Sequence, residues 1–191
     1  MKKSIGQYIS GLMVRNHYNQ STLARELGVS RQMLSNIVLD RREVSLPLSL
    51  KIESLFSLQE GSVLKIQDEY KVRQYKKQLR DELFEKLQRA HAFWSYDEVE
   101  QSDFPDELLI EDVFVHLDID DISELFELFP KNFVQKVWRE NMAVQGEYIF
   151  DLNVMIAIVF FHIKKPEAYI RRQELLYIKK LTQDTSSAPS P

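Results

Sequence analysis

A run of hydrogen-bonding side chains lies within the segment SRQMLSNIVLDRR, residues 30–42. A helix through this segment brings Arg31, Gln32 and Asn36 to one face, because residues three to four positions apart are neighbours on a helix surface. These side chains carry paired donors, or a donor beside an acceptor, and such forks match the edges of guanine and adenine in the major groove of DNA. The pattern therefore indicates hydrogen-bond readout of bases.

The residues around this run favour contacts with phosphate. Polar residues open the preceding helical pattern, and helix N-termini with small hydroxyl or amide side chains suit phosphate oxygens. Arg41 and Arg42 follow the run and are expected near the DNA backbone. The predicted DNA-contacting residues are Gln20, Ser21, Thr22, Ser30, Arg31, Gln32, Ser35, Asn36, Arg41 and Arg42.

Helices must position these side chains. Apolar spacing predicts helices over residues 5–15, 20–27, 30–39 and about 47–56, with Ser30 as an N-cap. Gly28 is expected to end the second helix with a positive φ, and Ala24 allows a close crossing. The apolar contacts of the pair are expected from Leu23, Leu27, Val29, Leu34 and Ile37. The alternative is an ordinary helical hairpin whose polar face is only solvated.

The segment LARELGVSRQMLSNIVLDRREVSLPLSLKIESLF resembles the Xre/Cro-type helix-turn-helix, in the branch that includes HigA-type antitoxins. The resemblance covers residues 4–70. It implies a four-helix DNA-binding fold, a dimeric repressor and DNA contacts at Gln20, Arg31, Gln32, Ser35 and Asn36. In one departure, IVLDRR stands where the family often has an acidic residue followed by Gly or Asn.

The whole chain is predicted to be all-α: an N-terminal helix-turn-helix domain of four or five helices, a long connecting helix and a small helical C-terminal domain. The long helix is expected over 62–90, with Val72, Leu79, Leu83 and Leu87 on one face. Further helices are predicted over 106–116, 119–129, 132–140, 152–161 and 167–181. The predicted divisions are 1–61, 62–92, 93–181 and a disordered tail, 182–191.

Charge divides the chain as well. The net charge of the 191 residues is −4, but residues 1–92 carry 16 basic against 10 acidic side chains. Residues 93–163 carry 3 basic against 16 acidic side chains, a net charge of −13. A basic front half and an acidic block behind it indicate two separate tasks. The chain has no cysteine, which excludes disulfides and thiolate chemistry.

The segment DIDD, Asp118–Asp121, could suggest a metal-dependent nucleotidyltransferase. Such a site needs a Gly-Ser turn just upstream, and the preceding residues are FVHL. The favoured interpretation is that Asp118 caps a helix while Asp120 and Asp121 complement its dipole. The four histidines lack metal-ligand spacing. No catalytic, metal or cofactor site is predicted, and no enzyme activity is expected.

Residues 90–165 resemble a helical module associated with antitoxin-like partners of abortive-infection nucleotidyltransferase toxins. The matching features are the FWSYD entry and the segments ELLIEDVFVHLDIDDISELF and FPKNFVQKVW. Aromatic side chains in the polar segment before 106 are candidate interface anchors: Phe93, Trp94, Tyr96 and Phe104. FDLNVMIAIVFFHI is apolar around most of its circumference, so it is expected to be a central helix or to be covered by a partner.

The sequence thus predicts a repressor that binds double-stranded operator DNA as a homodimer and also serves as the antitoxin of a toxin–antitoxin pair. The alternative is a plain transcription factor whose C-terminal domain dimerises or senses a ligand. An enzyme fused to a DNA-binding module is a third class without a supporting motif. The longest apolar run, residues 154–161, is far shorter than a bilayer requires, so a cytoplasmic protein without a membrane segment is expected.

Overall fold

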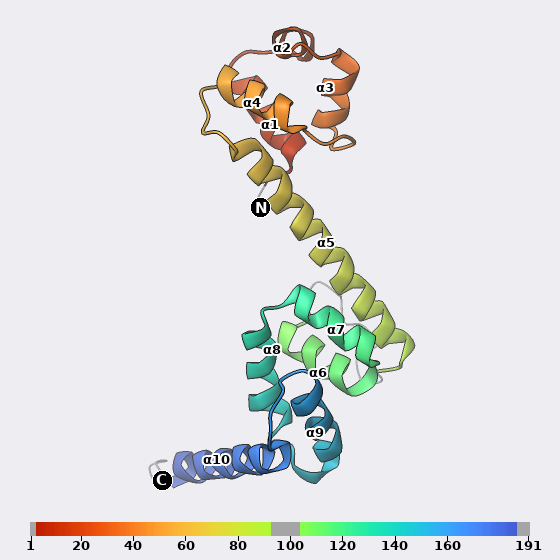
Figure 1. The fold of residues 1–191 in the computed structure, drawn as a ribbon, viewed down its shortest axis with the longest axis vertical. Helices are drawn as coiled ribbons and strands as arrows, with labels where there is room; N and C mark the ends of the chain where they lie inside the picture. Colours follow the sequence, from red (N-terminus) through yellow and green to blue (C-terminus); the bar gives the residue numbers. More distant parts are fainter. Residues whose placement is uncertain (1–2, 93–103, 187–191) are drawn as a thin grey trace, which may run out of the picture. The chain divides into compact units, whose positions relative to one another are not determined.

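The computed structural model describes residues 3–92 and 104–186, and the described residues form helices without a strand (Figure 1). The chain divides into two compact units, residues 1–77 and 78–191. The first contains α1 (Ile5–Arg15), α2 (Gln20–Leu27), α3 (Arg31–Val38), α4 (Leu46–Leu55) and the start of α5 (Ser62–Arg89). The all-α prediction is confirmed, and α1 and α2 have the predicted bounds.

The first unit has one apolar core, to which α1 to α4 and the start of α5 contribute. Ile9, Leu23, Leu34, Ile37 and Ile52 are completely buried there. The start of α5 is fixed by the buried carboxylate of Glu53 on α4, which accepts hydrogen bonds from the amides of Gly61 and Val63 at 3.0 and 2.8 Å. These bonds satisfy amides that lack partners within the first turn of a helix.

The second unit contains the rest of α5, α6 (Asp106–His116), α7 (Ile119–Leu128) and α8 (Lys131–Val137). A π-helical turn (Trp138–Met142) and a 3-10 turn (Gly146–Ile149) lead to α9 (Phe150–Val159) and α10 (Pro166–Ser186). α10 continues past residue 181, so residues 182–186 are helical rather than part of a disordered tail. Polar composition suggested that a tail begins at residue 182, but the helix continues to Ser186.

The long helix α5 contributes residues to the cores of both units. Leu79, Leu83 and Leu87 are buried in the core of the second unit, whereas Val72 is 53% exposed. The apolar face predicted for this helix is therefore covered by the core of the second unit along the second half of α5, but not at Val72. The division between the units falls inside α5, after Lys77, rather than at either end of a separate connecting helix.

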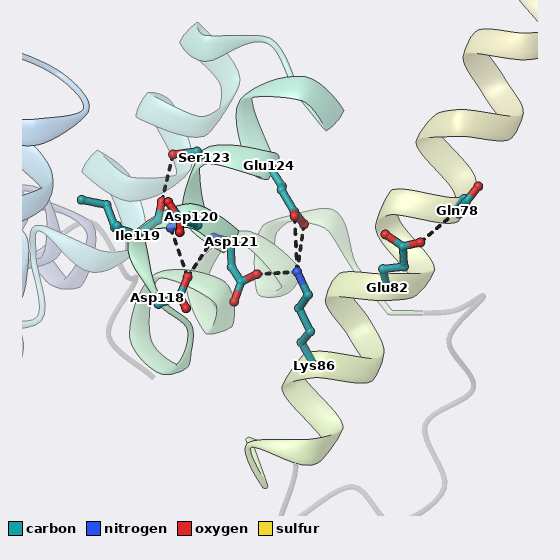
Figure 2. A network of polar contacts seen from close by, with 9 residues as sticks. All are labelled: Gln78, Glu82, Lys86, Asp118, Ile119, Asp120, Asp121, Ser123 and Glu124. Atoms are coloured by element: carbon teal, nitrogen blue, oxygen red, sulfur yellow. Dashed lines mark hydrogen bonds and ion pairs between the residues drawn. The ribbon is translucent and has the colours of Figure 1, made fainter.

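Polar contacts join the second half of α5 to α6 and α7. The ammonium of Lys86 points toward α7, where it pairs with Asp121 and lies 3.3 Å from the carboxylate of Glu124 (Figure 2). The hydrogen bond to Asp121 is the main cause that raises the pKa of Lys86. Arg80 pairs in the same way with Asp106 at the start of α6.

The DIDD segment begins α7. Oδ1 of Asp118 accepts hydrogen bonds from the amides of Asp120 and Asp121, both at 3.1 Å, which confirms the capping interpretation (Figure 2). Asp121 also pairs with Lys86. These aspartates therefore start a helix and attach it to α5.

The core of the second unit is built around Trp138, which is completely buried. Its indole N–H donates to Oδ1 of Asn153 at 2.8 Å, and Nδ2 of Asn153 donates to the carbonyl of Met142 at 3.0 Å. The buried amide thus satisfies both the indole and a carbonyl of the π-helical turn. α9 is only partly central: Ile156 and Ala157 are buried, but Ile158 is 51% exposed.

One predicted interface anchor is corrected. Phe104 is 5% exposed and packs edge-on against Phe84 of α5, with ring centroids 5.5 Å apart, so it belongs to the core. Its polar, proline-containing surroundings in the sequence suggested an exposed position, but α5 supplies an apolar neighbour. Phe93, Trp94 and Tyr96 lie outside the described residues.

Candidate nucleic-acid interface

Local hydrogen bonds define where α2 and α3 begin. Oδ1 of Asn19 accepts from the amide of Thr22 at 2.9 Å, while Oγ1 of Thr22 accepts from the amide of Asn19 at 3.1 Å. Oγ of Ser30, the predicted N-cap of α3, accepts from the amide of Met33 at 3.1 Å. The side chains of Thr22 and Ser30, both predicted DNA contacts, therefore shape the helix starts.

Gly28 connects the two helices in the left-handed conformation, with φ of 68°, as the sequence predicts. The amide of Val29 donates to the carbonyl of Ala24 at 2.9 Å, the 6→1 bond of a Schellman C-cap. The ammonium of Lys51, on α4, donates to the carbonyl of Leu27 at 3.1 Å. Sequence reasoning did not identify this second support, because Lys51 lies 24 positions away in the chain.

The inner faces of the pair are packed as predicted. Five residues are at most 2% exposed, and Val29 is half-buried against them. Because α3 is held on this side, its opposite side is presented to solvent. The five buried residues are Leu23, Ala24, Leu27, Leu34 and Ile37.

Arg31 and Gln32 are exposed at the start of α3, and Ser35 and Asn36 are partly exposed one turn later. Nε2 of Gln32 lies 3.4 Å from Oδ1 of Asn36, within hydrogen-bonding reach. The structure thus brings the two amide forks side by side on the open face of the helix. Each retains further donors or acceptors for a ligand.

The loop after α3 is tied back to the helix. The carbonyl of Asn36 accepts hydrogen bonds from the amides of Arg41 at 2.8 Å and Arg42 at 3.2 Å. Both arginine side chains are exposed. On α2, Ser21 is exposed and Gln20 is partly exposed at the first helical position. The main chain carrying the two arginines is therefore fixed relative to α3.

Asp40 is a positioning residue that sequence reasoning missed. It has a left-handed backbone, with φ of 56°, and its carboxylate accepts from the Gly6 amide at 2.8 Å and from Oγ of Ser4 at 2.6 Å. Asp40 thus caps α1 from the end of α3. The available signal was the departure in IVLDRR: aspartate tolerates the left-handed conformation that Gly or Asn adopts more readily.

The described residues contain no group of three or more His, Asp or Glu side chains arranged to hold a metal ion. In the same part of the chain, no helix is both long and apolar enough to cross a membrane.

Residues 12–60 match the helix-turn-helix family of the Xre/Cro type. The matched region begins within α1 and ends before α5, so it contains the turn and both helices described above. No curated protein and no solved structure matches the chain. The match identifies a DNA-binding domain and does not extend to the antitoxin branch or to the second unit.

Proposed function

We propose that this helix-turn-helix protein is a sequence-specific transcriptional repressor that binds its operator as a homodimer. The observation that supports this function most directly is the open face of α3, where Arg31 and Gln32 are exposed while Leu34 and Ile37 are buried behind them. A helix held on its apolar side can insert its other side into a major groove. Repression follows if the operator overlaps the promoter.

In this proposal Arg31, Gln32 and Asn36 read base edges. Arginine pairs with guanine through two donors, and glutamine or asparagine pairs with adenine through a donor and an acceptor. The sugar–phosphate backbone is contacted by Gln20, Ser21, Ser35 and the two arginines after α3. Thr22 and Ser30 contribute mainly through the helix starts that their side chains stabilise.

The experiment is a mobility-shift titration with a duplex selected from a random library by the full-length protein. Arg31→Ala should weaken binding by about 1–3 kcal/mol, or roughly 5- to 150-fold, and relax the preference at one base pair. Arg25→Ala is the matched control, because Arg25 is exposed on α2 but outside the predicted contacts. Unchanged affinity in both Arg31→Ala and Gln32→Ala would refute the assignment of α3 as the recognition helix.

A homodimer is proposed because one recognition helix offers few base contacts. Two copies related by a two-fold axis read two half-sites about one helical turn apart, which multiplies specificity. The selected duplex is therefore expected to contain an inverted repeat. Recovery of single, unpaired sites only would contradict this part of the proposal.

We further propose that the second unit silences a toxin. The supporting observation is charge: residues 104–163 carry 12 acidic against 3 basic side chains. A toxin that acts on RNA needs a basic surface, and an acidic protein can compete for it. This surface is unsuited to face DNA, whose phosphates would repel it.

The toxin proposal is tested with the product of the neighbouring reading frame. That product should arrest growth when expressed alone, and the Arg31→Ala/Gln32→Ala chain should still relieve the arrest, because DNA binding and neutralisation use different units. A neighbour that is harmless without this protein would refute the antitoxin role and leave the plain regulator.

A further inference from the structure

The loop after α3 places a carboxylate on each side of two arginines, in the order Asp40, Arg41, Arg42, Glu43. We call residues 40–44 the arginine loop. Neighbouring side chains of opposite charge attract each other, so a segment of this composition is expected to neutralise itself. A self-neutralised loop would attract a phosphate group only weakly.

The structure engages both carboxylates elsewhere. The two oxygens of Asp40 accept hydrogen bonds from the start of α1, at 2.6 and 2.8 Å. The carboxylate of Glu43 lies 2.6 Å from the ammonium of Lys71 on α5. Within the part of the chain that the structure describes, no residue forms an ion pair or hydrogen bond with either arginine guanidinium. The arginine pair therefore keeps its charge for a ligand.

α5 also holds the main chain of the arginine loop. The amide of Val44 donates to Oε1 of Gln67 at 2.7 Å, and Nε2 of Gln67 donates to the carbonyl of Val44 at 3.2 Å. Both residues are buried, with Gln67 5% and Val44 2% exposed. The side-chain amide thus satisfies both backbone groups of a buried residue and fixes the end of the loop to α5.

The contacts with α5 are polar because the space beside them is open. A hollow of about 220 Å³ is lined by loop residues 40–43 and Ile5, together with Gln67, Tyr70 and Lys71 of α5. Apolar side chains do not fill this space, so the position of the loop beside α5 depends on the hydrogen bonds of Gln67 and on the ion pair of Lys71.

We propose that Gln67 and Lys71 are positioning residues of the DNA interface. Gln67 holds the arginine loop, and Lys71 neutralises Glu43, so that both guanidiniums remain available to phosphate groups of the DNA backbone. This proposal deepens the proposed function and rests on the phosphate contacts assigned there to the arginine pair. Since the family match ends at residue 60, the proposal extends the DNA-binding unit beyond the matched region into α5.

Salt titrations of the full chain with the selected duplex test the role of Gln67. Gln67→Met keeps the length of the side chain but removes its donor and acceptor. It should reduce the slope of log K against log salt by about one to two, since each displaced arginine loses about one phosphate. A smaller folded fraction lowers the affinity by the same factor at every salt concentration, so the slope separates positioning from stability.

Gln74→Met is the matched control for Gln67→Met, because Gln74 is exposed on the same helix, and it should keep the unmodified slope. Hydrogen exchange at the amide of Val44, measured without DNA, checks that Gln67→Met opens the contact. An unmodified slope in a Gln67→Met chain whose Val44 amide exchanges faster would overturn the role of Gln67.

Lys71→Met tests the second contact without a buried change, because both partners of the pair are largely exposed. The variant frees the carboxylate of Glu43 beside the arginine pair and should reduce the slope by about one. Lys71→Met/Glu43→Gln removes that carboxylate and should regain the unmodified slope. Lys77→Met, an equal change in net charge at another exposed position of α5, should not alter it.

A double variant with the reduced slope of Lys71→Met would contradict the neutralisation of Glu43 by Lys71. Arg42→Ala separates this proposal from the assignment on which it rests. If Arg42→Ala keeps the unmodified slope, the phosphate contact of the proposed function is wrong, and the present proposal fails with it. If Arg42→Ala reduces the slope while Gln67→Met and Lys71→Met do not, the contact is retained and only the role of α5 is refuted.

Discussion

The amide of Gly6 donates a hydrogen bond to Oδ1 of Asp40 at 2.8 Å, so a residue in the loop that follows α3 caps the first turn of α1. The other carboxylate oxygen accepts from Oγ of Ser4 at 2.6 Å. Asp40 immediately precedes the two arginines of the proposed DNA interface. The stability of α1 and the geometry of that interface are therefore coupled through one side chain.

Substitutions at Asp40 can separate the carboxylate from the backbone. Asp40→Ala loses both hydrogen bonds and places a less tolerant residue at positive φ, so it should destabilise the first unit by about 2–3 kcal/mol. Asp40→Gly loses the same bonds but relieves the backbone, so it should cost less than alanine. Hydrogen exchange of the amides in α1 and α3 measures the effect. Equal protection in all three proteins would show that the cap contributes nothing.

Two glycines in α1 should respond oppositely to alanine. A Cβ added at Gly6 would stand 2.2 Å from the carbonyl oxygen of Val38, which is backbone, whereas a Cβ at Gly11 meets nothing within 4 Å. Gly6→Ala should therefore destabilise the first unit by about 3 kcal/mol or more, because the added methyl group pushes α1 away from α3. Gly11→Ala should stabilise by up to about 1 kcal/mol, because alanine favours a helix.

Thermal unfolding followed by far-ultraviolet circular dichroism, with hydrogen exchange to locate the change, compares the two glycine variants. A Gly6→Ala protein as stable as the unmodified chain would mean that α1 and α3 can separate without loss.

Arg42 should contribute to affinity without contributing to specificity. If it contacts phosphate, Arg42→Ala should weaken binding to every duplex alike and reduce the slope of log K against log salt by about one. Titrations at several salt concentrations measure that slope. Arg15→Ala, an exposed change at the end of α1, should leave it unchanged. A base-specific loss in Arg42→Ala would place Arg42 in a groove instead.

The contact between Lys86 and α7 should make the second unit sensitive to alkaline pH. A raised pKa means that the folded state favours the charged amine; this stabilisation is complete below the unfolded pKa, near 10.4, and is lost as the pH rises through the folded value. Lys86→Met should cost about 0.5–1 kcal/mol at neutral pH, because a third of the side chain is exposed and water screens the pair.

Trp138 lies in the core of the second unit, so tryptophan fluorescence can follow the unfolding of the Lys86→Met protein. The loss of stability in the Lys86→Met protein, relative to the unmodified chain, should become smaller as the pH rises above the ordinary lysine pKa. Arg89→Met is the control, since its partner Glu85 and Arg89 itself are largely exposed and their pair should contribute little. A deficit that stays constant up to the most alkaline pH would contradict an electrostatic role.

Local patterns determined the helices of this protein and its proposed recognition surface. Gly28, the Ser30 cap and the spacing of Leu23, Leu27, Leu34 and Ile37 act over a few residues, so their neighbours in the sequence are sufficient to define the turn and the exposed face of α3. The same holds for Asp118 at the start of α7. These are the features in which prediction and structure agree.

Tertiary structure alone decided which distant residues meet. Asp40 accepts a hydrogen bond from Gly6, 34 positions away in the sequence, and Lys86 pairs with Asp121, 35 positions away. Likewise, only packing shows that Leu79 is covered while Val72 is exposed, and that Phe104 lies in a core. The periodicity of a helix defines a face but not what covers it, because burial depends on the surface that another element presents.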